Sequence, residues 1–411
     1  MFETPSNLIV GLEIGTSKVC AVVGEINAEG ALNIIGLGQA PSRGLRKGEI
    51  VETTAAEESV RQAIVEAEQM ANVEICNVYL GVTGAHLRGF NNRGVHRVLS
   101  ADRDITKDDV SDVVKNARTI NLPKENSIVH DVRQHFILDG HEGIVNPEGM
   151  VGSLLEVDVH VVHGVTNRMQ NSVRLVRNLN LEVNEIVFTG LASALALLSS
   201  EQKEIGALVV DLGGGTTNYV LYANGVIKHT GVFAIGGDHV SNDLGHGLKV
   251  PLSRAEKLKL EFGTAVVPES SKGQTISICN EMNMPVKTLN LEHLQRIMAV
   301  RLEELLQIIR DDLAEAGVLH YVQGGVYLCG GGARIPHIAQ LSETIFQAPV
   351  SLGQSNTISG LKSALDQPEF LTAIGLVKYG SMRKRKPEPA TLFTHFQTNL
   401  HSIFTRFLPQ R

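Results

Sequence analysis

The feature that most constrains this chain is a short unit that occurs twice. An apolar stretch, a glycine turn with hydroxyl side chains and a second apolar stretch run from Val10 to Val23, and the same order returns from Val209 to Tyr222. Two such units, about 200 residues apart, predict two similar α/β halves that face each other.

The segments around both units alternate between strand-like and helix-like patterns. Apolar, β-branched runs predict strands at Asn7–Ile14, Lys18–Gly24, Leu32–Gln39, Asn77–Thr83, Leu181–Thr189, Ala207–Leu212, Tyr219–Tyr222, Thr230–Ile235 and Val326–Cys329. Helical spacing of apolar residues predicts helices at Thr54–Met70, Asn167–Asn178, Gly190–Ser200, Gly236–Gly245, Leu252–Phe262, Asn290–Glu315 and Asp366–Tyr379. Between Gly84 and Val165 the chain is richer in charge and histidine, with one short helix near Lys107–Asn116, so we expect an inserted subdomain there.

The two glycine turns are candidate phosphate contacts. Glycine lets a backbone approach an anion closely, and neighbouring hydroxyls can donate to phosphate oxygens. Lys18 can offset phosphate charge, and Asp211, at the end of a buried strand, can hold Mg²⁺ through its water ligands. Two ordinary tight hairpins would give the same pattern. The predicted contacts are Gly15, Thr16, Ser17, Lys18, Asp211, Gly213, Gly214, Gly215, Thr216, Thr217 and Asn218.

Neither turn matches a common nucleotide-binding motif. No Gly-Lys-Ser/Thr follows the glycines, which excludes a Walker A loop. A strand rather than a helix follows each turn, which excludes a Rossmann fingerprint.

A third glycine run lies between a strand and the start of a helix, where a base or ribose can rest against bare backbone. It contains Gly330, Gly331 and Gly332 and is followed by Arg334. On the helix that begins near Ser253, Glu256 and Lys259 are placed to reach ribose hydroxyls, although a solvated pair one turn apart has the same spacing. Gly237, at the start of another predicted helix, completes the predicted nucleotide contacts.

The composition is that of a globular protein. The 411 residues are 43% hydrophobic and 20% charged, as in a globular chain. No run approaches eighteen apolar residues, and the first residues lack the pattern of a signal peptide. The four cysteines make no metal-spaced pair, so we expect reduced core thiols and a cytosolic location. The net charge of −7 disfavours nucleic-acid binding.

The last residues differ from the acidic body. Between residues 381 and 411 there are six Arg or Lys residues and one Glu. Ser381–Ala390 contains two prolines and is expected to be a loose linker. An apolar stripe at helical spacing follows, which predicts a helix lying in a lipid interface, although a helix packed on the body or a partner-binding coil remains an alternative. The stripe consists of Phe393, Phe396, Leu400, Ile403, Phe404 and Phe407.

The order of these motifs resembles the superfamily of actin, sugar kinases and DnaK-type chaperones, with Gly325–Ile338 matching its adenosine motif. The finer resemblance is to the FtsA family of bacterial cell-division proteins. It is carried by LIVGLEIGTSKVCAVVGE, NIIGLG, PSRGLRKGEIV, GGDHVSNDL and YLCGGGARI, and it runs nearly end to end. The implied fold is an actin-like α/β duplication with a nucleotide cleft, an inserted subdomain and a C-terminal amphipathic helix.

The resemblance also implies a division of the chain. Residues 1–84, 164–204 and 358–380 form the core of the first half, and residues 85–163 form the inserted subdomain. Residues 205–229 and 301–357 form the core of the second half, and residues 230–300 its smaller subdomain. Residues 381–390 are the linker and residues 391–411 the membrane helix.

The function that the resemblance implies is a cytoskeletal adaptor at the division site, on the cytoplasmic face of the bacterial inner membrane. It binds ATP and Mg²⁺, polymerises with itself, contacts anionic lipids, and binds the C-terminal peptide of FtsZ on the smaller subdomain. Arg301 is a candidate contact for that acidic peptide, although an exposed arginine would look the same. The inserted subdomain is expected to bind other divisome proteins.

Two differences from the pattern of related ATP-hydrolysing proteins lead us to expect little ATP hydrolysis. Asn218 stands where many relatives have aspartate, and the segment Ile186–Leu191 offers no carboxylate to orient an attacking water. The nearest acid, Glu185, is expected to face away, so we predict little ATP hydrolysis and no enzymatic role. The alternatives are a small-molecule kinase of the same superfamily, which would need an aspartate in that segment, and a pilus-assembly adaptor, which would not need the lipid helix.

Overall fold

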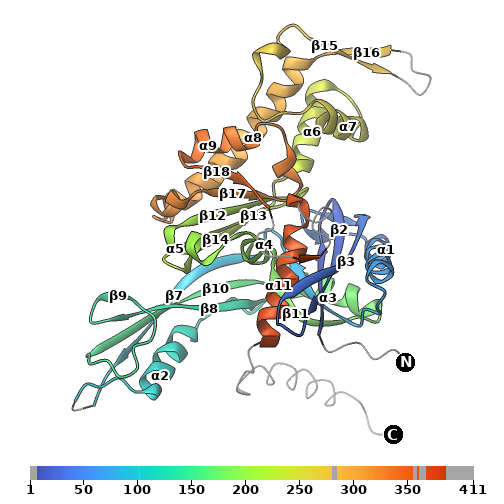
Figure 1. Ribbon diagram of the computed structural model, residues 1–411. Helices are drawn as coiled ribbons and strands as arrows, with labels where there is room; N and C mark the ends of the chain where they lie inside the picture. Colours follow the sequence, from blue (N-terminus) through green and yellow to red (C-terminus); the bar gives the residue numbers. More distant parts are fainter. Residues whose placement is uncertain (1–6, 101, 280–284, 355–358, 361–366, 386–411) are drawn as a thin grey trace.

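The computed structural model describes residues 7–100, 102–279, 285–354, 359–360 and 367–385. Two mixed sheets form the two halves, with the first half on the right of the view and the second above and to the left (Figure 1). The predicted membrane helix and the second half of the predicted linker, residues 386–390, lie outside the described residues. No helix in the described ranges is long and apolar enough to cross a membrane.

The first half is built on a six-stranded sheet of order β11-β6-β1-β2-β3-β19. Its strands are β1 (Leu8–Ile14), β2 (Lys18–Ile26), β3 (Leu32–Pro41), β6 (Asn77–Val82), β11 (Glu182–Phe188) and β19 (Ser359–Gly360). Helices α1 (Thr53–Ala71) and α3 (Thr166–Asn178) pack against one face of it, where β1 residues such as Leu12 are fully buried. A small hairpin, β4 (Leu45–Arg46) and β5 (Glu49–Ile50), connects β3 to α1.

The second half repeats this topology in a sheet of order β14-β13-β12-β17-β18. As in the first half, the two hairpin strands are antiparallel and the next neighbour is parallel. The strands are β12 (Ala207–Leu212), β13 (Thr217–Ala223), β14 (Val226–Phe233), β17 (Val326–Cys329) and β18 (Val350–Leu352). Helices α5 (Ser200–Ile205), α8 (Leu291–Glu315) and α9 (Ile338–Phe346) complete this half, and the predicted duplication is confirmed.

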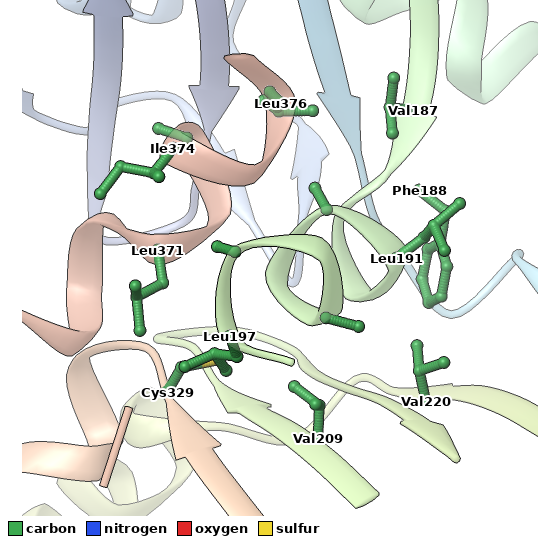
Figure 2. Close-up of a cluster of buried hydrophobic side chains, with 14 of the residues drawn as sticks. Val187, Phe188, Leu191, Leu197, Val209, Val220, Cys329, Leu371, Ile374 and Leu376 are labelled. Atoms are coloured by element: carbon green, nitrogen blue, oxygen red, sulfur yellow. The ribbon is translucent and has the colours of Figure 1, made fainter. Parts of the chain in front are cut away.

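Two helices lie between the sheets of the two halves. These are α4 (Thr189–Leu197) and α11 (Leu371–Arg385), which cross each other closely enough that a Cβ on Gly375 would lie 1.8 Å from the carbonyl oxygen of Ala192. Figure 2 shows their apolar side chains meeting residues of both sheets, among them Val187, Val209, Val220 and Cys329. The two halves therefore share one continuous core at this junction.

The inserted subdomain has its own sheet, of order β7-β10-β8-β9, in the lower left of Figure 1. It consists of β7 (Arg88–Arg97), α2 (Lys107–Arg118), β8 (Asn126–Leu138), β9 (His141–Ile144) and β10 (Leu154–Val165). The sheet also contacts the second half, because the side chain of Asn91 donates to the carbonyl of Lys228 at 3.1 Å and His160 bonds the Thr230 hydroxyl at 2.9 Å.

The smaller subdomain of the second half lies at the top of Figure 1. It contains α6 (Gly237–Leu248), α7 (Leu252–Phe262), β15 (Thr275–Cys279) and β16 (Pro285–Asn290), with the first turns of α8. Strand β14 remains paired with β13 as far as Phe233, three residues past the predicted boundary at residue 230. Helix α8 runs through the predicted boundary at residue 300 without a break, so its first turns belong to the smaller subdomain and the rest to the core of the second half.

The predicted linker, Ser381–Ala390, begins too early. Helix α11 continues to Arg385 because its last turn is tied to the first half. The guanidinium of Arg383 pairs with the carboxylate of Glu185 at 2.8 Å, and Lys384 donates to the carbonyl of Leu8 at 2.7 Å. Of the cysteines expected in the core, Cys20 and Cys329 are buried, but Cys76 is exposed at the end of the loop before β6.

Candidate functional site

A cavity of about 540 Å³ lies between the two halves, within the usual range for a small-ligand pocket. It is lined by the two predicted phosphate hairpins, by the third glycine run and by α7. The predicted residues that line it are Gly15, Thr16, Ser17, Lys18, Asp211, Gly213, Gly214, Thr216, Asn218, Gly237, Glu256, Lys259, Gly330, Gly331, Gly332 and Arg334. Sequence segments more than 300 residues apart therefore meet at one site.

Two predicted contacts lie behind this lining. Thr217 is fully buried, and its hydroxyl donates to the carbonyl of Ile235 at 2.8 Å, which fixes the end of β14 instead of facing the cavity. Gly215 packs against the backbone of Lys47 and the hydroxyl of Thr16. Both residues shape the second hairpin, and neither is among the described residues that line the cavity.

Asp211 ends β12 and is held by hydroxyls from the junction helices. Thr372 of α11 donates to its carboxylate at 3.2 Å, and Ser193 of α4 does so at 3.4 Å. Burial raises the pKa of Asp211, whereas these hydrogen bonds act in the opposite direction. A fixed carboxylate at the edge of the cavity is suited to bind the water shell of a hard cation.

A second carboxylate, Glu13 of β1, faces the same space. Burial, and then the charge of Asp211, raise the pKa of Glu13 to about 8. Two carboxylates this close in a poorly solvated site favour a bound cation between them. Glu13 lies within the segment that carries the family resemblance but was not predicted from the sequence as a site residue.

Four cavity-lining side chains carry a buried polar atom without a hydrogen-bond partner among the described residues. The atoms are Glu13 Oε2, Lys18 Nζ, Thr189 Oγ1 and Glu369 Oε2. Buried polar groups are normally satisfied, so this concentration indicates a polar ligand. Acceptors and donors occur together, which fits a metal–phosphate group with both cationic and anionic parts.

Lys18 lines the cavity, and its ammonium is buried. Its ammonium sits 4.0 Å from the ring centroid of Phe370, and burial lowers its pKa. Glu13, Asp211 and Glu369 partly restore the charged form. A buried ammonium without a hydrogen-bond acceptor within the described structure is well placed to receive a phosphate oxygen.

Glu256 and Lys259 form an ion pair at 2.7 Å on α7, as their spacing of one turn allows. Both side chains also line the cavity that contains the predicted nucleotide contacts. Lys259 donates to the carbonyl of Gly237 at 3.1 Å, and Ser241 donates to Glu256. Arg334 is held by the carboxylate of Glu369 at 2.5 Å.

Several lining residues were missed by the sequence analysis. They are Glu13, Thr83, Thr189, Leu260, Glu369 and Thr372. Thr83 and Thr189 each stand at the carboxyl end of a predicted strand beside the first hairpin, a position that could have marked them. Leu260 and Glu369 carry no comparable signal.

Arg301 lies outside the cavity, on α8. It is neither free nor fully exposed, since its guanidinium pairs with Asp243 at 2.5 Å and also with Glu304. These residues border a separate groove of about 340 Å³, which has Ile297 and Val300 in its lining. Val300 is 60% exposed, so the groove offers apolar surface next to fixed charges.

The raised pKa of Glu13 predicts a pH-dependent effect of Glu13→Gln. A carboxyl whose native pKa lies above its unfolded value contributes stability below the unfolded value, and this contribution is lost as pH rises through about 8. Without nucleotide or metal, we expect Glu13→Gln to raise the free energy of unfolding at pH 8 by about 1–2 kcal/mol, and by much less near pH 5.5. Urea unfolding at both pH values measures this. Glu29→Gln, in an exposed loop, is the control, and an equal effect of Glu13→Gln at both pH values would contradict the prediction.

Comparison with known proteins places these features in one family. The family model for "Cell division protein FtsA" matches residues 208–375, and the model for the "SHS2 domain inserted in FTSA" matches residues 84–163. FtsA of Pseudomonas aeruginosa is 36% identical over 377 residues, which is 92% of this chain and 90% of that protein. FtsA of Escherichia coli K12 is 34% identical over 384 residues, covering 92% and 91%.

Solved structures give the same fold. The PilM–PilN type IV pilus biogenesis complex matches with a TM-score of 0.65 at 17% identity, covering 91% of this chain and 98% of that chain. MreB5 of Spiroplasma citri bound to ADP matches with a TM-score of 0.55 at 14% identity, covering 92% and 98%. At these identities the likeness establishes an actin-like fold.

Proposed function

Since the chain belongs to the FtsA family of cell-division proteins, we propose that it binds Mg·ATP between its halves and tethers FtsZ filaments to the membrane as a polymer. The observation that carries the nucleotide site is the set of four unsatisfied polar atoms in one cavity. The ADP-bound state of the similar MreB5 structure gives further support.

Different residues of the cavity are suited to different parts of Mg·ATP. Asp211 and Glu13 are suited to hold the hydrated metal ion, and Lys18 with the hydroxyls and amides of both hairpins is suited to hold phosphates. The third glycine run and α7 line the rest of the cavity and are suited to contact the nucleoside. A bound Mg²⁺ would neutralise phosphate charge, and the protein would contribute position and orientation.

Slow hydrolysis is part of the proposal. Glu185 is bound to Tyr379 and Arg383 and does not line the cavity. Glu256 and Glu369 are held in ion pairs, and Asn218 presents an amide whose oxygen accepts from Thr83 at 2.6 Å. Among the described carboxylates that line the cavity, only Glu13 therefore lacks a fixed partner. Glu13 lies beside Asp211, where a cation is needed.

We expect the purified protein to release phosphate from ATP far more slowly than about 1 s⁻¹, a low value for an enzyme. A coupled phosphate-release assay with saturating Mg·ATP measures this. Turnover near 1 s⁻¹ would overturn this part of the proposal.

The groove beside Arg301 supports a peptide partner. The groove combines the apolar side chains of Ile297 and Val300 with two arginines, of which Arg301 is paired with Asp243 and Glu304. Apolar surface beside arginines fits a peptide with aliphatic and acidic side chains, such as the FtsZ C-terminus that the family resemblance implies. The inner membrane at the division site is the location that follows, with the inserted subdomain available to other divisome proteins. A small-molecule kinase lacks support because Ile186–Ser200 contains no aspartate, and the apolar tail disfavours a pilus adaptor.

Arg301→Glu is expected to weaken binding of the FtsZ peptide by at least about tenfold, since it places a third acid beside Asp243 and Glu304. Co-sedimentation with FtsZ on anionic vesicles and fluorescence anisotropy of the labelled peptide measure this. Arg310→Glu, on the same helix but outside the groove, is the matched control. Equal binding by both variants would place the peptide elsewhere.

A further inference from the structure

The hairpin β4–β5 lies against the candidate site, and its turn falls within the segment PSRGLRKGEIV, which carries part of the family resemblance but was assigned no role in the site. Its two-residue turn, Lys47–Gly48, has positive φ at both positions, 53° and 77°, and Arg46 pairs with Glu49 across it. This is a type I′ turn, which favours glycine at its second position. The turn does not itself line the cavity.

The turn contacts three parts of the chain that do line the cavity. The amide of Gly48 donates to the hydroxyl oxygen of Thr16 at 2.9 Å. A Cβ on Gly48 would lie 3.0 Å from the methyl carbons of both Thr216 and Thr83, and the backbone of Lys47 packs against Gly215. The hairpin therefore bridges the phosphate turns of the two halves and the end of β6.

The hydrogen bond to Thr16 has a chemical consequence. Because the hydroxyl oxygen accepts the amide of Gly48, its own hydrogen points elsewhere, and Thr16 lines the cavity. Its neighbour Thr83 is also committed, since it donates to Asn218 at 2.6 Å. The Thr16 hydroxyl therefore keeps its own hydrogen available for another acceptor, at the place where the two phosphate turns meet.

We propose that the Lys47–Gly48 turn is a positioning element that aims the Thr16 hydroxyl at the terminal phosphate of a nucleoside triphosphate. The proposal rests on the nucleotide site proposed above and adds a selection for ATP over ADP. The selection follows because the group assigned to this point, the terminal phosphate, is present in ATP and absent from ADP. Gly48 acts through Thr16 and does not touch the ligand.

The test is Gly48→Ala, measured by calorimetric titration of ATP and ADP with Mg²⁺. We expect wild type to prefer ATP, and the variant to lose about tenfold in ATP affinity, equal to one well-aimed hydrogen bond, but less than twofold in ADP affinity. Gly30→Ala is the matched control, since Gly30 has a similar φ of 80° but no atom within 4 Å of its Cβ position. It carries the same backbone strain without the contacts, and we expect it to bind like wild type.

Thr16→Val distinguishes positioning from general damage. Alone it should reduce ATP affinity about as much as Gly48→Ala, and combining the two should add little, because both remove the same donor. Additive losses, equal loss of ATP and ADP affinity, or an unchanged Gly48→Ala would each overturn the proposal. Failure of wild type to bind any nucleotide would instead reject the nucleotide site itself.

Discussion

Asp211→Asn is expected to lower the affinity for ATP in the presence of Mg²⁺ by about 10- to 100-fold, as changes around a bound metal ion typically do. The change keeps the shape of the side chain and an oxygen that can accept from Thr372 and Ser193. It removes the charge that would hold the hydrated metal. The halves should remain folded, because the core around α4 and α11 is untouched.

The same variant makes the opposite prediction without metal. A buried carboxylate repels the phosphates of free ATP, so Asp211→Asn should bind metal-free ATP at least as well as wild type. Titration with and without Mg²⁺ thus provides an internal control. A loss of affinity that is equal in both conditions would indicate that Asp211 supports the hairpin and does not hold the metal.

Deletion of residues 391–411 is expected to abolish sedimentation with anionic vesicles. The predicted apolar stripe and the basic residues before it would supply membrane affinity by burial of aromatic side chains and by attraction to lipid headgroups. A single charge on the stripe, Phe404→Asp, should have most of this effect. Ser402→Asp, placed on the opposite side of the predicted helix, is the control.

The outcome of these tail variants separates two functions of that segment. If the deletion variant still pellets with vesicles, the tail is not the anchor. If Phe404→Asp and Ser402→Asp weaken binding equally, charge and not the apolar stripe determines attachment. Nucleotide binding should be unchanged in all three variants, because each leaves intact the described residues that line the cavity.

The duplicated hairpins could be predicted from the sequence because glycine turns between apolar strands are local signals. Val10–Val23 and Val209–Tyr222 became β1–β2 and β12–β13 with nearly the predicted ends. Helix α8 was equally clear, since one face carries a buried apolar series from Leu294 to Leu313. Short-range patterns were sufficient for these elements.

The missed features depend on long-range contacts. The extension of α11 is stabilised by Glu185, 198 residues before Arg383, and no local pattern near Pro387 indicates it. Glu13 interrupts a strand that is buried on both faces, and sequence alone does not tell whether such a charge faces a cavity or an ion pair. The paired state of Arg301 similarly required Asp243, which lies on another helix.

The inserted subdomain shows a mixed outcome. Its charge and histidine content marked it as separate, and α2 lies where one short helix was predicted. Its contact with β14 was not predicted, because His160 and Thr230 belong to segments 70 residues apart that approach only in the folded chain. The contact connects the insertion to the second half as well as to the first, so its position depends on both halves.

The central claim is that Mg·ATP in the cleft supports assembly and that assembly secures attachment to the membrane. Weak anchors gain strength when many copies are joined, which is why the two properties are expected to appear together. Electron microscopy of the full chain on an anionic lipid monolayer tests this directly. We expect filaments with Mg·ATP, and none without nucleotide or with Asp211→Asn. Filaments that form equally well in all three conditions would contradict the claim.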